Sequence, residues 1–302
     1  MIVGPTAVGK TAVALALAEH WPNVEVVSAD SRQVYRGLDI ATAKPTRREQ
    51  QRVVHHMIDL IRPGERYNAG RYALEAGDAI SRVRAGGHIP LVVGGTGLYV
   101  RALVDGLFVE PSLDRPRRES LDAVTASMDH AMLVRWASRL DRGYTGAGGR
   151  HRATRAIEVA LLSGRSLSWW QRAAASQGVV TPWMVRLTVP RAVLHQRIRT
   201  RTEEMVRRGL VEEVAAAMAD GAPTTGPGMD GIGVREAVAV LQGRLPRESL
   251  VDAITIATRQ YAKRQETWFR HQLRAEVLTL DATRSPEHVA ATIATAWEHT
   301  GA

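Results

Sequence analysis

The stretch Gly4-Pro5-Thr6-Ala7-Val8-Gly9-Lys10-Thr11 decides the fold class of this chain. It matches the pattern G-x-x-x-x-G-K-[S/T], follows the apolar pair Ile2-Val3, and opens an Ala- and Leu-rich segment that favours a helix up to Glu19. In such a strand–loop–helix unit the glycines let backbone N–H groups close around phosphate oxygens, and the helix N-terminus adds a favourable dipole. The sequence therefore predicts a di- or triphosphate site over Gly4 to Thr11, with Lys10 as a point charge and Thr11 as a hydroxyl ligand for Mg²⁺.

Short β-branched runs alternate with longer helical stretches along the rest of the chain. They lie at residues 24–27, 56–60, 90–93, 185–189 and 277–280. This alternation predicts an α/β fold, with a P-loop NTPase-like parallel sheet flanked by helices. Ile2 and Val3 alone make a strand too short to precede a phosphate loop, so we expect the natural chain to begin a few residues upstream.

The central part of the chain breaks this alternation. Residues 113–181 are helical in pattern and rich in Arg and Ala, with a Gly-rich interruption at 143–149. We expect a helical insertion over residues 113–181 within a core made of residues 1–112 and 182–302. The adjacent Trp169 and Trp170 could stack on RNA, but packing between the insertion helices is the role we favour.

The composition excludes some kinds of site and favours a polyanionic partner. The 302 residues include no cysteine, which excludes disulfides, thiolate metal sites and a cysteine nucleophile, and no apolar run reaches membrane length. We therefore expect a cytoplasmic protein without a membrane partner. The formal net charge is +9, and residues 114–172 hold eleven arginines against six acids, which favours a polyanionic partner. Only Lys10, Lys44 and Lys263 are lysines, which suggests sites where a compact ammonium is required.

A carboxylate suited to nucleotide hydrolysis is not obvious. The best strand, residues 90–93, runs into Gly94-Gly95-Thr96-Gly97 where an ATPase usually has an acidic residue. Asp59 could replace it, although an Asp at a strand end is as often a turn former. Asp30 follows the second strand, on the rim where α/β sheets bind ligands, and is either a base or a helix cap.

Several longer motifs carry a resemblance to a known family. They are Gly4–Thr11, Ser28–Pro45, Gly94–Leu103, His151–Glu158, Arg197–Met205, Gly209–Val214 and Tyr261–Arg270. Through them the chain resembles the tRNA dimethylallyltransferases over nearly its whole length. The resemblance implies transfer of a dimethylallyl group from dimethylallyl diphosphate to the exocyclic amine of the adenosine 3′ to the anticodon.

The resemblance also implies roles for individual residues. Gly4 to Thr11 would hold the diphosphate, Asp30 would be the base, and Thr11 and Arg201 would stabilise the departing pyrophosphate. The implied partner is the tRNA anticodon stem-loop, the implied cofactor is Mg²⁺ at Thr11, and we expect a monomer. The implied tRNA contacts are Asp30, Ser31, Arg32, Gln33, His151, Arg152, Arg155, Gly233, Arg235, Lys263 and Arg264.

The chain departs from the family pattern at two of these places. His151 stands where the family has Gln, and Val234 replaces an aromatic residue. These departures put the base-reading contacts in question but leave the phosphate loop and Asp30 intact. An adenylate prenyltransferase, a small-molecule P-loop kinase and a non-catalytic RNA-binding ATPase are the alternatives; the basic insertion argues against the first.

Overall fold

The structure is a computed structural model that describes residues 1–107, 113–146, 148–173, 178–273 and 277–299. It divides the chain into two compact units, Met1–Val104 with Val180–Ala302, and Asp105–Val179. The insertion boundaries expected from sequence are 112/113 and 181/182, and residue 112 itself lies outside the described residues.

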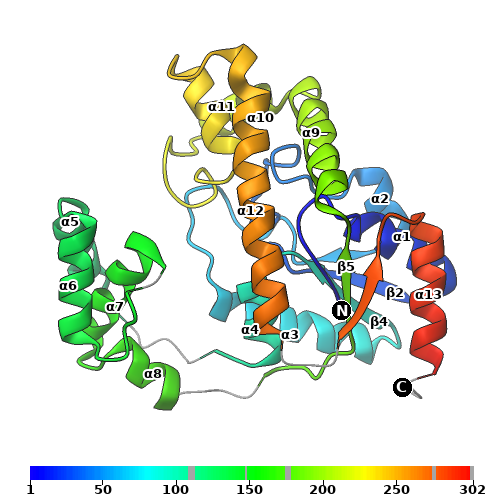
Figure 1. Cartoon of the computed structure of the whole chain (residues 1–302), viewed down its shortest axis with the longest axis horizontal. Coiled ribbons are helices and arrows are strands. Elements are labelled where there is room, and N and C mark those ends of the chain that lie inside the picture. The colour runs from blue at the N-terminus through cyan, green and yellow to red at the C-terminus, as the bar shows by residue number, and fades with distance from the viewer. Residues whose placement is uncertain (108–112, 147, 174–177, 274–276, 300–302) are drawn as a thin grey trace. The chain divides into compact units, whose positions relative to one another are not determined.

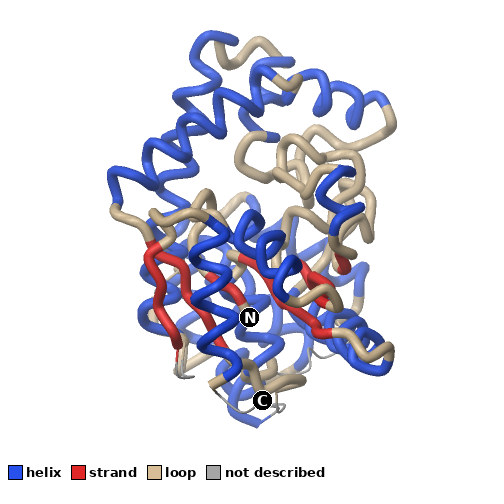
Figure 2. The backbone as a smooth tube through the Cα atoms, turned by 90° about the vertical axis from the view of Figure 1, so that its right-hand side faces the viewer, coloured by secondary structure: helices blue, strands red, loops and turns tan. Residues whose placement is uncertain are grey.

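The first unit is built on a six-stranded sheet in the order β3-β2-β4-β1-β5-β6, in which every pair of neighbours is parallel. The strands are the red segments of Figure 2. The strands are β1 Ile2–Val3, β2 Val24–Ser28, β3 His55–His56, β4 Ile89–Gly94, β5 Met184–Thr188 and β6 Val277–Asp281. This arrangement confirms the predicted α/β class. Because all six strands point the same way, the segments that follow them meet at one edge of the sheet.

The first unit also contains helices. They are α1 Lys10–His20, α2 Arg47–Arg52, α3 Ala69–Ala85, α4 Gly97–Val104, α9 Arg191–Arg207, α10 Leu210–Ala219, α11 Val234–Leu241, α12 Leu250–Gln272 and α13 Pro286–Glu298, with a 3-10 turn η1 at Arg247–Ser249. Helices α1 and α3 pack against the strands, whereas α10 and α11 pack on each other and on α9 and α12. Helices α1 and α13 lie side by side and bury Leu17 and Ile293 in one core with the strands (Figure 1). No helix in the described ranges is long and apolar enough to cross a bilayer.

The strand expected at residues 56–60 is wrong for most of its length. Strand β3 ends at His56, and Met57 and Asp59 have φ of 64° and 54°. Positive φ is incompatible with an extended strand, so the chain turns here and pairs again only at a bridge between Ile61 and Tyr35.

The second unit contains helices α5 Arg115–Ala126, α6 His130–Leu140, α7 Gly149–Ser163 and α8 Leu167–Ala173. Its core includes Leu133 and Ile157. The buried packing expected for the tryptophan pair is wrong for Trp169, which is 37% exposed and stacks under Arg165. Helix α8 has no buried residue, although Leu167 packs against this core and Ser168 bonds Asp141.

The glycines after β4 allow segments from distant parts of the chain to approach closely. A Cβ on Gly94 would lie 2.2 Å from the carbonyl oxygen of Ala29, and one on Gly97 would lie 2.4 Å from the ring of Trp268 on α12. These contacts explain why glycine stands where an ATPase usually has a carboxylate. The end of β4 is used to pack against β2 and α12.

Replacing Gly97 by Ala should destabilise the protein by about 1–3 kcal/mol, since the added methyl overpacks the Trp268 contact. The urea midpoint of unfolding measures the change. Gly70→Ala on α3 is the matched control, because its Cβ would meet nothing closer than 3.4 Å, and it should be neutral or slightly stabilising. Equal midpoints for the two variants would contradict this packing account.

Candidate functional site

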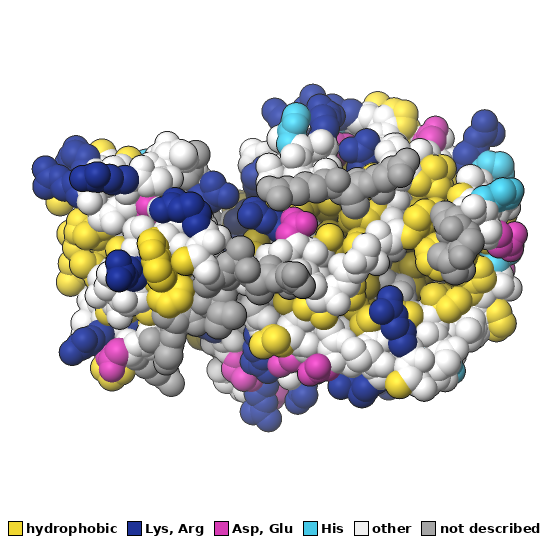
Figure 3. Space-filling view, turned by 90° about the horizontal axis from the view of Figure 1, so that it is seen from below, with side chains coloured by type: hydrophobic (Ala, Val, Ile, Leu, Met, Phe, Trp, Pro, Cys, Tyr) yellow, Lys and Arg dark blue, Asp and Glu magenta, His cyan; other side chains and the backbone are white. Residues whose placement is uncertain are grey.

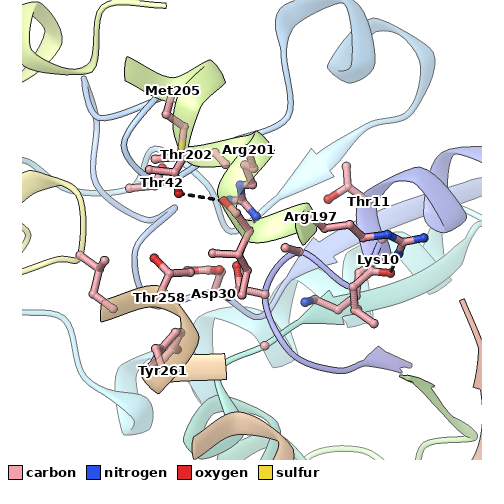
Figure 4. A pocket seen from close by; sticks show the side chains of 18 of the residues that line it. Lys10, Thr11, Asp30, Thr42, Arg197, Arg201, Thr202, Met205, Thr258 and Tyr261 are labelled. Atoms are coloured by element: carbon pink, nitrogen blue, oxygen red, sulfur yellow. Dashed lines mark hydrogen bonds between the residues drawn. The ribbon is translucent and has the colours of Figure 1, made fainter. Parts of the chain in front are cut away.

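A cavity of about 1330 Å³ opens at the carboxyl ends of the strands in the first unit. Its walls come from the phosphate loop, the turn after β2, helix α9 and helix α12. Lys10, Asp30 and Arg201 project into the same space from three of these elements (Figure 4). Thr11 also lines this cavity, so the residues expected to be catalytic, Asp30, Thr11 and Arg201, lie around one space with Lys10.

The predicted phosphate loop has the backbone conformation that its glycines permit. Gly4, Ala7 and Gly9 have φ of 152°, 61° and 112°. The Lys10 Nζ donates hydrogen bonds to the carbonyl oxygens of Gly4 at 2.9 Å and Pro5 at 2.8 Å. An ammonium has three donors, so one remains for a ligand. The first N–H groups of α1 begin at Lys10 and are the donors that a phosphate requires.

Two arginines one turn apart on α9 hold this loop from the other side. Arg197 donates through Nη1 to the Val8 carbonyl and through Nη2 to the Ala282 carbonyl, each at 2.8 Å. Arg201 donates through Nη1 to the Thr6 hydroxyl at 3.2 Å. Residues four apart lie on one face of a helix, so both guanidinium groups reach the loop together.

The cavity holds positive charge that the protein does not neutralise. Burial lowers the pKa of Lys10 to about 8, and Asp30 raises it only in part while Arg201 lowers it further. Burial also lowers the pKa of the Arg201 guanidinium. Within the described part of the chain, neither cation forms an ion pair. A bound anion would relieve both of these desolvation costs.

Asp30 is fixed by the backbone around it. Its Oδ1 accepts a hydrogen bond from the Arg32 N–H at 2.8 Å. Thr96 bonds the residues on both sides of Asp30. Its N–H donates to the Ala29 carbonyl at 3.1 Å, and its hydroxyl accepts from the Ser31 N–H at 3.0 Å. The turn after β4 therefore brackets the carboxylate, which is half-buried in the cavity wall.

The remaining residues predicted to contact tRNA in this unit divide into two groups. Ser31, Arg32, Gln33, Arg235 and Arg264 line the cavity. The Gln33 amide is engaged, because it accepts from the Ser28 hydroxyl at 2.9 Å and donates to the Ala43 carbonyl at 3.2 Å. The described lining residues do not include Gly233 or Lys263. Gly233 is the N-cap of α11, and Lys263 is exposed on α12.

The other predicted contacts lie on α7 of the second unit. His151 and Arg152 are exposed. Arg155 donates to the buried carboxylate of Glu158 at 2.8 Å, and Arg118 pairs with the same carboxylate. Arg155 therefore contributes to the structure of the unit. Cationic side chains predominate over acidic ones on the face of this unit seen at the left of Figure 3.

Asp59, the alternative Mg²⁺ ligand, is paired elsewhere. Its Oδ1 accepts from Lys44 at 2.6 Å, and Lys44 also bonds Asp39 at 2.6 Å and the Tyr35 carbonyl at 2.6 Å. The Lys44 side chain is only 1% exposed. One of the three lysines therefore holds together the loop that carries Ala41 to Ala43 in the cavity wall.

The sequence analysis assigns no role to Arg197 or to Gln265, and both side chains bond the phosphate loop from the cavity wall. Arg197 could have been found, because it lies one helical turn before Arg201. Gln265 lies within the motif Tyr261–Arg270, but its contacts could not be predicted, because its partners Thr6 and Gly95 are 259 and 170 residues away along the chain.

Comparison with known proteins identifies the family of this chain. The family model described as "IPP transferase" matches residues 33–272, and the model described as "Isopentenyl transferase" matches residues 1–61. The chain belongs to the IPP transferase family.

Individual relatives match over most of their length. The tRNA dimethylallyltransferase of Koribacter versatilis (strain Ellin345) is 40% identical over 278 residues, covering 90% of this chain and 89% of the relative. That of Leptothrix cholodnii (strain ATCC 51168 / LMG 8142 / SP-6) is 39% identical and covers 98% and 94%. The crystal structure of the tRNA isopentenylpyrophosphate transferase of Bacillus halodurans has 33% identity and a TM-score of 0.69, covering 99% and 96%.

Affinity for inorganic pyrophosphate should fall as the pH rises above about 8, the pKa of Lys10 in the free site. The bound anion favours the ammonium, so the pKa of Lys10 is higher in the complex, and between the two pKa values affinity falls at most about tenfold per pH unit. Isothermal titration from pH 7 to pH 10 measures this slope. Lys10→Arg is the control, because arginine stays charged over this range and any remaining pH dependence comes from pyrophosphate itself. Identical slopes of log affinity against pH for the wild type and Lys10→Arg would show that Lys10 is not the titrating group.

Proposed function

We propose that this protein is a tRNA dimethylallyltransferase. It transfers a dimethylallyl group from dimethylallyl diphosphate to the exocyclic amine of the adenosine 3′ to the anticodon and releases pyrophosphate. The names of its relatives support the reaction class. The observation that carries the proposal is the convergence of two partly buried cations and one carboxylate, Lys10, Arg201 and Asp30, in one large cavity.

The charges suit displacement of a diphosphate leaving group. The amine nitrogen forms a bond to the allylic carbon while the bond from that carbon to the diphosphate oxygen breaks. Negative charge grows on the departing pyrophosphate, where Lys10, Arg201 and the α1 N-terminus stabilise it. The amine loses one proton, which Asp30 accepts. Thr6, whose hydroxyl bonds Arg201, contributes a further polar group at the same place.

Mg²⁺ would accompany the diphosphate and neutralise part of its charge. The Thr11 hydroxyl lies on the cavity wall beside Lys10 and suits this ion (Figure 4). The described residues contain no cluster of three or more His, Asp or Glu side chains able to hold a metal. Mg²⁺ often takes one or two protein ligands and completes its shell with substrate oxygens and water, so this sparse site is compatible with it.

The second unit is the proposed contact for the anticodon stem-loop. Its exposed His151 and Arg152 provide donors for phosphate groups, and its sequence is strongly basic. The target base would have to leave the stack to reach a carboxylate in the cavity wall. An adenylate prenyltransferase would not need such a basic unit, and a kinase would consume ATP.

Incubation with radiolabelled dimethylallyl diphosphate and an unmodified tRNA tests the proposal. The wild type should label tRNA, and Asp30→Asn should slow labelling by about 10²- to 10⁴-fold because the carboxylate acts on the amine. Pyrophosphate affinity should not fall, because the change removes a negative charge near Lys10 and Arg201. Asp78→Asn, an exposed change on α3, is the control. ATP consumption without tRNA labelling would support a kinase. A fully active Asp30→Asn would show that Asp30 is not the base.

Arg152→Ala should weaken tRNA binding and reduce the slope of log affinity against log salt by about one, as expected for one lost phosphate contact. Filter binding at several salt concentrations measures the slope. Arg82→Ala, an exposed arginine change on α3, should leave it unchanged. An unaltered slope for Arg152→Ala would exclude this residue from the RNA surface.

A further inference from the structure

Gln265 lies in the wall of the cavity with its amide engaged on both sides. Its Oε1 accepts a hydrogen bond from the Thr6 N–H at 2.8 Å, and its Nε2 donates to the Gly95 carbonyl at 2.7 Å. The residue is 6% exposed. One side chain on α12 therefore joins the phosphate loop to the turn after β4.

The turn that Gln265 holds is the one that brackets Asp30. Thr96 follows Gly95 directly and bonds the main chain at Ala29 and at Ser31. A continuous path of hydrogen bonds thus runs from Thr6 through Gln265 and the turn to the residues on either side of the carboxylate. In the sheet, β4 lies between β1 and β2 and pairs with both, with Val3 opposite Gly94 and Ser28 opposite Val93. Gln265 adds a side-chain link beyond the ends of these strands.

The fit around Gln265 is tight. A Cβ on Gly95 would lie 2.5 Å from the Gln265 Nε2 and 3.2 Å from the Gly4 carbonyl oxygen. The bond to Gln265 also withdraws the Thr6 N–H from the set that can bind phosphate. Thr6 is held at two points, its N–H by Gln265 and its hydroxyl by Arg201.

We propose that Gln265 is a positioning residue that sets the spacing between the leaving-group site and the base. This rests on the proposed function. Both polar ends of its side chain are bound by the protein, so it acts through Thr6 and Gly95 and not on the substrates. Loss of either contact removes this link and lets the phosphate loop and the Asp30 turn shift relative to each other beyond the ends of β1 and β2. A misplacement of about 1 Å between reacting groups can cost about 10² in rate.

The test compares Gln265→Met, which keeps the approximate length and removes both hydrogen bonds, with Gln260→Met on the exposed face of the same helix. Single-turnover labelling of tRNA at saturating substrates should fall about 30- to 100-fold for Gln265→Met per folded molecule. The affinity for pyrophosphate should change less than about fivefold, because Lys10, Arg201 and the α1 N-terminus remain. Gln260→Met should match the wild type.

Gln265→Glu provides a second readout should the methionine variant fold poorly. A carboxylate keeps the acceptor for Thr6 but has no donor for Gly95, whereas a protonated carboxyl group has both. The labelling rate of Gln265→Glu should therefore be below the wild-type rate at neutral pH. The ratio of the two rates, measured at the same pH, should approach one as the pH is lowered.

Two results overturn the proposal. One is a Gln265→Met rate within twofold of Gln260→Met, and the other is a loss explained fully by the smaller folded fraction. An active wild type with an equally active Gln265→Met defeats the positioning role alone. A wild type that labels no tRNA defeats the proposed function and the positioning role together.

Discussion

Unneutralised positive charge in a partly buried cavity is the constraint on which the site depends. Lys10 and Arg201 are desolvated by the fold, and the described structure provides neither with an ion-paired carboxylate. Such an arrangement costs stability in the free protein and is relieved only when an anion binds. In the proposed reaction the same charges would stabilise a leaving diphosphate more than a neutral substrate group, so their binding energy would act where charge develops.

The scaffold holds these groups through side chains on remote helices. Arg197 and Arg201 of α9 bond the phosphate loop, and Gln265 of α12 ties that loop to the turn beside Asp30. Glu213 of α10 accepts the N–H groups of Asp39, Ile40 and Ala41, which fixes another part of the cavity wall. With the donors already oriented, little reorganisation is needed when charge moves.

Local patterns predicted the parts of the fold that depend on neighbouring residues. The phosphate-loop motif and four of the five β-branched runs correspond to the observed elements, because strand period and loop glycines are local properties. The run at 56–60 failed because Met57 and Asp59 adopt positive φ around the buried Lys44, a tertiary contact. The sequence shows only that glycines stand at the end of β4 where an ATPase usually has a carboxylate. The structure gives the reason, which is that Gly94 packs against Ala29 and Gly97 packs against Trp268, both distant in the sequence.

The position of the diphosphate relative to Asp30 tests the account most directly. A crystal structure with a non-reactive analogue of dimethylallyl diphosphate should show the phosphates within hydrogen-bond distance of Lys10, Arg201 and the first N–H groups of α1. The allylic carbon should face the Asp30 carboxylate across a space wide enough for an amine. Phosphates bound away from the loop, or a prenyl group directed away from Asp30, would contradict the account.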